Sequence, residues 1–401
     1  MTSAQSSNKA IWVSYAAFIG LGLQAGLLGL AWTSIQREFN QPLEAVGVLL
    51  FASTAGYLTS SFVSGPLAHR LGYARLFIAG AVLFVLGVFG FALAPQWELV
   101  ALAAIVAGLG SGSIDGGLNA YSAVHFSARV VNWMHACFGI GITVAPLMLT
   151  ALLTVASWRA GYALVAVYLV FVLGLFLWSR RTWGWPPEHA PEPGEAHRRG
   201  ALDALRSPLV WISILIFVLY AGVEVTPGQW TFSLFTEARG INPTAAGFWV
   251  SFYWASFTIG RLVFGFVGNR WPVKTVLRGT MVGLIAGALL YWLDPFNGLG
   301  GIIGLGVMGF SQAPMFPFLV LNTPLVMGSE RASHSIGFQV AGAGLGVAVI
   351  PSLAGVLAAN VGLAVIGPFV FVVAIMLFGV YELLNTLAGA RQRTLVSQSA
   401  D

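Results

Sequence analysis

Apolar stretches of about twenty residues alternate with short polar segments along almost the whole chain. A helix needs about 20 apolar residues to cross the hydrocarbon core of a bilayer. Turn signals such as Pro95-Gln96, Ser157-Trp158 and Asp294-Pro295 separate spans with short connections. The pattern predicts an all-α membrane protein with twelve transmembrane helices, at residues 11–34, 45–67, 74–94, 98–124, 132–155, 160–179, 209–233, 244–267, 273–293, 298–323, 334–358 and 363–386.

Composition supports a membrane protein. Of the 401 residues, 57% are hydrophobic and 8% are charged, whereas soluble proteins carry about 25% charged residues. The polar segment 1–9 leads directly into a span that is too long for a signal peptide, so we expect no cleavage. The single cysteine, Cys137, excludes an internal disulfide. The sequence has no metal-ligand cluster, phosphate-binding loop or nucleophile motif, so we expect no enzyme activity, cofactor or metal site.

The distribution of basic residues predicts the orientation. With the N-terminus inside, only Arg37, Arg159 and Arg239 of the 19 lysines and arginines fall in outside loops. This asymmetry follows the positive-inside rule, and a basic balance of this kind reflects cytoplasmic loops, not nucleic-acid binding. We therefore expect cytoplasmic termini and, as the location, a bacterial inner (plasma) membrane.

The chain divides into two similar halves. A polar, proline-rich linker at 180–207 separates an N-terminal six-helix bundle, 1–179, from a C-terminal one, 208–401. Gly141 and Pro146 recur 205 positions later as Gly346 and Pro351, and the segment from Gly65 to Arg70 recurs 200 positions later from Gly265 to Arg270. These matches predict an internal duplication with a central cavity, as in secondary transporters.

Two acids lie well inside the predicted helices, Asp115 and Glu224. An ionised side chain at bilayer depth costs about 2.5–3.5 kcal/mol, so such a residue indicates a functional site. Removal of a carboxyl group from water favours its neutral form, and we expect both acids to carry protons without forming a direct pair. Asn119 shares the face of Asp115, and His135 is a third candidate at the depth of Asn119. The alternative is that all three are packing or helix-bridging residues.

Amides and aromatic rings in the spans are candidate solute ligands, because sugar sites combine aromatic faces with groups that both donate and accept hydrogen bonds. The alternative for each aromatic residue is a lipid-facing or interfacial position. Pro314 and Pro317 predict a bend in the tenth span. The expected substrate-binding residues are Gln24, Trp32, Asn119, Asn132, Gln229, Trp230, Tyr253, Trp254, Gln312, Asn322 and Gln339.

The segment from Gly65 through Arg70-Leu71-Gly72 to Arg75 resembles the loop signature of the major facilitator superfamily. The resemblance implies two pseudo-symmetric six-helix bundles and a conformational role for Gly65, Arg70, Gly72, Arg75, Gly265 and Arg270. The acid that latches the halves in that family is replaced by His69 and Asn269. The arginines can also be read as plain inside-positive charges.

A narrower resemblance is to the fucose-permease-like branch. It is carried by Ile114–Asn119 in the fourth span, Val131–Gly141 in the fifth, Leu219–Glu224 with Gln229-Trp230 in the seventh, and Ala246–Arg261 in the eighth. It implies sugar–proton symport. One departure is that the first span offers Gln24 where symporters of that branch can carry an acid.

Together these features predict a secondary active transporter that works by alternating access. The expected partners are a sugar or similar small polar solute, protons and the lipid bilayer, and we expect a monomer. The main alternative is a drug or metabolite exporter of the same fold, because Gly141-x-x-x-Ala145-Pro146 partly matches an exporter signature. A membrane receptor is disfavoured because the linker is too short for a soluble domain, and a membrane enzyme because no nucleophile–base motif is present.

Overall fold

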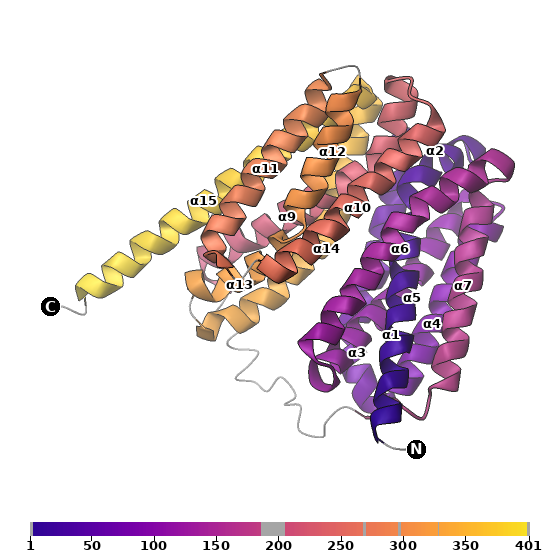
Figure 1. The fold of residues 1–401 in the computed structure, drawn as a ribbon, viewed down its shortest axis with the longest axis horizontal. Coiled ribbons are helices and arrows are strands. Elements are labelled where there is room, and N and C mark those ends of the chain that lie inside the picture. The colour runs from indigo at the N-terminus through magenta and orange to yellow at the C-terminus, as the bar shows by residue number, and fades with distance from the viewer. Residues whose placement is uncertain (1–2, 186–204, 268–269, 296–297, 328, 399–401) are drawn as a thin grey trace. The chain divides into compact units, whose positions relative to one another are not determined.

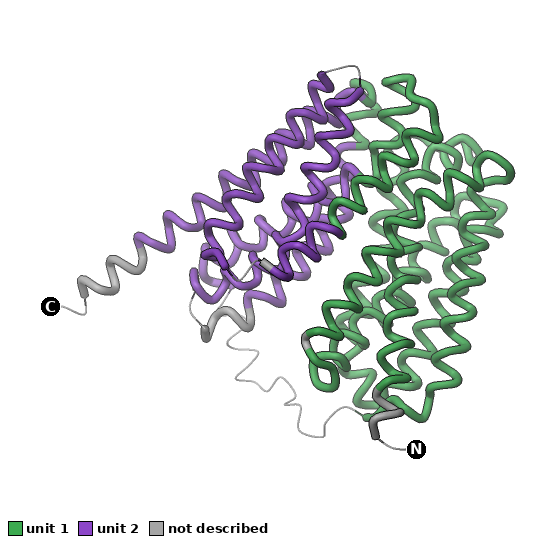
Figure 2. The backbone as a smooth tube through the Cα atoms, viewed as in Figure 1, with its two compact units in different colours: residues 1–190, 228–258, 355–363 green, residues 191–227, 259–354, 364–401 purple. Residues whose placement is uncertain are grey.

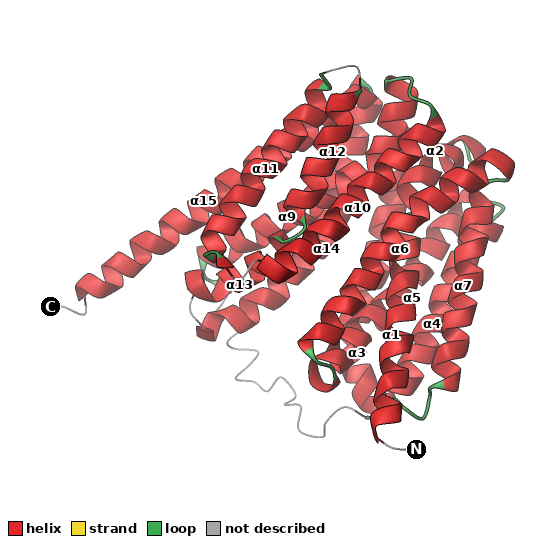
Figure 3. Ribbon diagram, viewed as in Figure 1, coloured by secondary structure: helices red, strands yellow, loops and turns green. Residues whose placement is uncertain are grey.

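The computed structural model describes the chain except residues 1–2, 186–204, 268–269, 296–297, 328 and 399–401. Every regular element in the described part is helical (Figures 1 and 3). The elements are α1 (Ser3–Ala25), α2 (Leu28–Glu38), η1 (Leu43–Ala45), α3 (Val46–Leu71), α4 (Tyr73–Leu93), α5 (Trp97–His125), α6 (Ala128–Val155), α7 (Trp158–Trp178), α9 (Pro208–Ser233), the π-helical turn η2 (Leu234–Ala238), α10 (Pro243–Val267), α11 (Val273–Leu293), α12 (Leu299–Gln312), α13 (Met315–Met327), α14 (Ser329–Val361), η4 (Leu363–Val365) and α15 (Ile366–Gln398).

The helices agree with the predicted all-α membrane fold. Ten spans in the described part are long and apolar enough to cross a membrane, and the pair α1–α2, bent by 45°, forms an eleventh. The remaining expected span is α10, whose 25 residues include Arg261 and several Ser, Tyr and Trp side chains that lower its hydropathy. The tenth expected span is interrupted where the prolines predicted a disturbance, because α12 ends at Gln312 and α13 begins at Met315, on either side of Pro314; a bend at this point stays a prediction.

Two compact units divide the structure (Figure 2). Unit 1 comprises residues 1–190, 228–258 and 355–363, and unit 2 comprises residues 191–227, 259–354 and 364–401. These limits are not the predicted bundle boundaries of 1–179 and 208–401, which stay a prediction. Most of the predicted linker 180–207 lies outside the described residues.

Small residues bring the helices of unit 1 into main-chain contact. A Cβ added at Gly108 would lie 2.1 Å from the carbonyl oxygen of Ser53, and one at Gly112 would lie 2.3 Å from that of Tyr57. Gly108, Gly112 and Gly116 follow one another every four residues on α5, so one face of α5 packs closely on α3. This seam fixes the position of Asp115.

Equivalent glycines make equivalent contacts in the two units. In unit 1, a Cβ at Gly141 of α6 would lie 2.3 Å from the carbonyl oxygen of Ile19 in α1. In unit 2, a Cβ at Gly346 of α14 would lie 2.2 Å from the carbonyl oxygen of Val218 in α9. The two glycines are the pair that the sequence repeat aligns, so the same helix contact accompanies the same motif.

Unit 1 also takes in the end of α9, because α2 packs against it. A Cβ at Gly29 would lie 2.3 Å from the carbonyl oxygen of Gly228. One turn further on, the hydroxyls of Thr33 and Ser233 are 3.1 Å apart, and beyond them Arg37 forms an exposed ion pair with Glu237 at 3.2 Å. Three successive layers therefore hold α2 against α9 and η2.

Candidate functional site

Asp115 lies half-buried at the seam between α3 and α5. The Tyr57 hydroxyl donates to Oδ2 at 2.5 Å, and the Asn119 side-chain amide donates to Oδ1 at 3.0 Å. The same amide donates to the main-chain oxygen of Asp115 at 3.0 Å, as expected for residues four apart on a helix. Each carboxylate oxygen thus has its own donor.

This arrangement can hold the carboxyl group in either protonation state. Hydrogen bonds to an ionised group are stronger than neutral ones, and two of them offset part of the cost of placing the charge in the membrane. When Asp115 is protonated, its new O–H needs an acceptor, and the Tyr57 hydroxyl can both donate and accept. The sequence predicted Asp115 and Asn119 but not Tyr57, because nothing in the pattern relates a tyrosine in α3 to an acid 58 positions later.

Glu224 occupies a comparable setting in α9 of unit 2. Its Oε2 accepts a hydrogen bond from the Tyr220 hydroxyl, one turn earlier on the same helix. The guanidinium of Arg261 in α10 supplies an opposite charge that acts on Glu224. In the described part of each unit, an intramembrane acid is therefore bound to a tyrosine. The spacing of four residues between Tyr220 and Glu224 was a signal that could have been used.

His135 and Asn132 occupy different environments in α6. The ring of His135 packs edge-on against Phe18 of α1, with centroids 5.4 Å apart. Asn132 is exposed. The Asn119 amide, which the sequence placed near the level of His135, is directed to Asp115. The proton-coupling role of His135 stays a prediction.

Several candidate solute ligands of unit 1 lie on or beside the end of α9. Gln229 and Trp230 are buried, and the Gln229 amide nitrogen has no hydrogen-bond partner among the described residues. The rings of Tyr253 and Trp254 are 4.9 Å apart, and a Cβ at Gly228 would lie 2.4 Å from the Trp254 indole. Trp32 of α2 is buried, and its indole N–H donates to the main-chain carbonyl of Leu43. Gln24 of α1 is half-buried beside the break between α1 and α2.

The candidates of unit 2 include a buried polar cluster on α13 and α14. Gln339 accepts a hydrogen bond from Thr323 at 3.0 Å. Asn322, next to Thr323, has a buried side-chain oxygen with no partner in the described part of the chain. Gln312, at the end of α12, is also buried. Buried amides are costly unless paired, so Asn322 is a candidate for contact with a polar ligand.

The residues of the loop motif lie at helix ends. Gly72 ends α3 with φ of 79°, a conformation that favours glycine. Arg70, Arg75 and Arg270 are exposed, and Gly65 and Gly265 have no neighbouring atoms within 4 Å of an added Cβ. Their conformational role stays a prediction.

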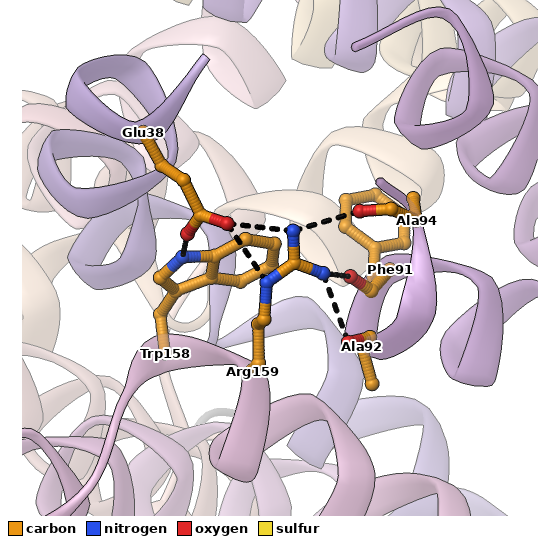
Figure 4. Close-up of polar contacts among 6 residues, drawn as sticks. All are labelled: Glu38, Phe91, Ala92, Ala94, Trp158 and Arg159. Atoms are coloured by element: carbon orange, nitrogen blue, oxygen red, sulfur yellow. Dashed lines mark hydrogen bonds and ion pairs between the residues drawn. The ribbon is translucent and has the colours of Figure 1, made fainter. Parts of the chain in front are cut away.

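A polar cluster that the sequence did not indicate joins α2, α4 and α7 (Figure 4). Glu38 accepts hydrogen bonds from the Trp158 indole at 2.6 Å and from Arg159 Nη2 at 2.7 Å. Arg159 also donates to the carbonyl oxygens of Ala92 at 2.9 Å and Ala94 at 2.7 Å. The last carbonyls of a helix lack partners within it, so Arg159 caps α4 while it anchors the end of α2. From the sequence, Arg159 was recognised only as one of three basic residues in the outside loops.

The fold and these sites define an integral membrane protein of the transporter class. Long apolar helices, equivalent contacts in two units and an intramembrane acid in the described part of each unit are features of secondary transporters. Within the described residues, no group of three or more His, Cys, Asp or Glu side chains is placed to hold a metal ion.

Comparison with known proteins agrees. The model of the Major Facilitator Superfamily matches residues 14–293. The glucose/mannose transporter GlcP of Bacillus subtilis (strain 168) is 22% identical over 351 residues, which cover 85% of this chain and 86% of GlcP. The 3-(3-hydroxy-phenyl)propionate transporter of Escherichia coli (strain K12) is 27% identical over 354 residues, which cover 84% and 83% of the two chains.

A crystal structure of a variant of the nucleoside transporter NupG shares the fold. Its TM-score is 0.79 at 11% identity, and the match covers 94% of this chain and 99% of NupG. The chain belongs to the major facilitator superfamily, as the motifs predicted. The presence of a sugar transporter among its relatives agrees with the resemblance to a sugar-transporting branch.

Proposed function

We propose that this protein moves a sugar or a similar small polar solute across the membrane by alternating access, coupled to protons. The observation that carries the proposal is Asp115, whose two oxygens are bound by Tyr57 and Asn119 at 2.5 and 3.0 Å. An intramembrane acid with a donor for each oxygen can take up and release a proton without loss of its position. Glu224, with Tyr220 and Arg261, is the second proton-coupling candidate.

The polar residues around α9 and α13 support a sugar-like solute. Gln229 of unit 1 is a buried amide with an unused donor, and Asn322 of unit 2 is a buried amide with an unused acceptor; a hydroxyl group can accept from the one or donate to the other. Trp230 follows Gln229 in the chain, the Trp254 indole lies against Gly228, and both tryptophan rings are buried and offer apolar faces. The name of the relative GlcP supports glucose and mannose as the first solutes to test.

The contacts of α2 with α9 and η2 are suited to a gate. The pairs Thr33–Ser233 and Arg37–Glu237 join segments that the sequence assigns to different bundles. One is a single neutral hydrogen bond and the other an exposed ion pair, so both can break at low cost. Alternating access would open this region in one half of the cycle. Cytoplasmic termini, location in a bacterial inner membrane and a monomeric state complete the proposal.

A metabolite exporter or antiporter is the second candidate. It is favoured by the 27% identity to a transporter named for an aromatic acid and by Arg261, a basic residue within a predicted span. Import by symport and export by antiport are distinguished by the direction of the proton gradient that drives solute accumulation.

Transport into liposomes of purified protein tests the proposal. An inward proton gradient should drive accumulation of labelled glucose or mannose, with the aromatic acid as a parallel substrate. Asp115→Asn should lower accumulation at least tenfold while retaining exchange of solute without a gradient. Glu98→Gln, the same chemical change at an exposed acid of α5, should behave as the unmodified protein. Equal accumulation by Asp115→Asn and the unmodified protein would refute the coupling role.

A further inference from the structure

Unit 2 contains a crevice of about 290 Å³ between α10, α11 and α12. Its lining includes Phe264 from α10, Trp271 from the segment before α11, Val276 and Gly279 from α11, and Phe310 and Ser311 from α12. The crevice is smaller than most sites for whole small molecules, which span about 300–1,000 Å³. Its size therefore suits part of an extended ligand.

The crevice is a wedge that glycines shape. At its closed end, a Cβ at Gly260 would lie 2.8 Å from the carbonyl oxygen of Phe310, and one at Gly283 would lie 2.4 Å from the Ser311 hydroxyl. One turn before Gly283, Gly279 has no atoms within 4 Å of an added Cβ. The helices therefore touch at one end and separate toward the beginning of α11.

The wedge is chemically apolar. Thr280, a polar residue of its lining, already donates its hydroxyl hydrogen within α11, where the carbonyl oxygens of Val276 and Leu277 are 2.9 and 3.1 Å away. The three helices that form the wedge also carry exposed apolar side chains: Leu262, Phe266, Val282 and Ile303. An apolar crevice that opens among such side chains in a membrane is filled by a hydrocarbon chain, not by water.

Basic residues stand at the open end. Arg270 precedes Trp271, Lys274 precedes Thr275, and both basic side chains are exposed. Arg278, one turn further on, already donates from Nε and Nη2 to the two carboxylate oxygens of Glu382, at 2.7 Å each. Basic pockets between transmembrane helices bind anionic lipid headgroups. Trp271, which is 53% exposed, is of the type that occupies the level of the headgroups.

We propose that this wedge binds one acyl chain of an anionic phospholipid, with the phosphate of the headgroup at Arg270 and Lys274. The chain would lie along Gly279 and Phe310 and end where Gly260 and Gly283 close the wedge. Such a lipid would bridge α10 and α11 where their side chains leave them apart. This site adds to the proposed transport function and does not depend on the solute.

Native mass spectrometry of the purified full chain tests the site, with phosphatidylglycerol and phosphatidylcholine at equal concentration as probes. The unmodified protein should retain phosphatidylglycerol at least fivefold over phosphatidylcholine. Gly279→Phe fills the wedge and should remove this excess. Gly174→Phe on α7 is the matched control, because Gly174 is also exposed with no atoms within 4 Å of its Cβ position, and it should keep the excess.

Arg270→Gln with Lys274→Gln tests the headgroup contact without any change in packing. The double variant should bind both lipids equally, at the level of phosphatidylcholine. This arm decides the proposal if Gly279→Phe fails to fold, as judged by its melting curve. Equal retention of phosphatidylglycerol by Gly279→Phe and Gly174→Phe would overturn the proposal, as would an unchanged preference in the double variant or no preference in the unmodified protein.

Discussion

Replacement of Gly112 by alanine tests whether the seam between α3 and α5 positions the proposed proton site. The added Cβ would lie 2.3 Å from the carbonyl oxygen of Tyr57 and 2.4 Å from the Ser60 hydroxyl, whereas ordinary contacts are 3.4–4 Å. The carbonyl is part of the main chain and cannot rotate away, so the helices must separate by about 1 Å. The Tyr57–Asp115 bond, now 2.5 Å, would then stretch to about 3.5 Å, the limit for a hydrogen bond.

The expected cost follows from two opposing effects. Overpacking against main-chain atoms lowers the free energy of unfolding by about 2–3 kcal/mol. The higher helix propensity of alanine raises it by about 1 kcal/mol. The net loss of about 1–2 kcal/mol corresponds to a fall of a few degrees in Tm. Proton-driven uptake should fall about tenfold, because a bond to a charged group is worth about 1.5–3 kcal/mol.

Thermal melting of the purified protein and uptake into liposomes measure the two effects. Gly174→Ala is the control, because its added Cβ meets no atom within 4 Å; it should melt at or above the temperature of the unmodified protein and transport normally. The reasoning fails if Gly112→Ala melts with the control and retains full proton-driven uptake.

Two further predictions concern α2. Arg159→Lys should lower Tm by a few degrees relative to the exposed control Arg129→Lys, because one lysine cannot both bind Glu38 and cap α4. The partly exposed ion pair with Glu38 contributes at most about 1 kcal/mol of this loss. Equal melting temperatures of the two variants would contradict the capping role. The second prediction uses Thr33→Cys with Ser233→Cys in a Cys137→Ser background, because the two native hydroxyls are 3.1 Å apart. Mild oxidation should join the two new thiols in a disulfide, and transport should stop until the disulfide is reduced. A cross-linked protein that still transports would show that this contact need not open.

The sequence was sufficient to predict the fold class, while the role of the two acids stays a prediction. The match of Gly141 with Gly346 predicted an internal duplication, and the two glycines make equivalent helix contacts. Asn119 was correctly placed on the face of Asp115, because that inference depends on helical spacing alone. Pro314 likewise predicted the break between α12 and α13.

Partners from other helices could not be predicted in this way. Tyr57 reaches Asp115 only because Gly108 and Gly112 let α3 approach α5, and Glu38 meets Arg159 across 121 positions of sequence. Such pairs depend on which helices are neighbours and how they are rotated, and hydrophobic periodicity in a membrane helix contains little of this information because lipid-facing and buried positions are both apolar.

The neighbours Arg37 and Glu38 at the end of α2 differ in how firmly they are held. Glu38 receives hydrogen bonds from Trp158 and Arg159, while Arg37, 72% exposed, has a single ion pair with Glu237. The Arg37–Glu237 ion pair should break first under thermal motion, so α2 should move together with α4 and α7 when the region opens. A spectroscopic label on α2 would then report little displacement relative to α7 and a large one relative to η2.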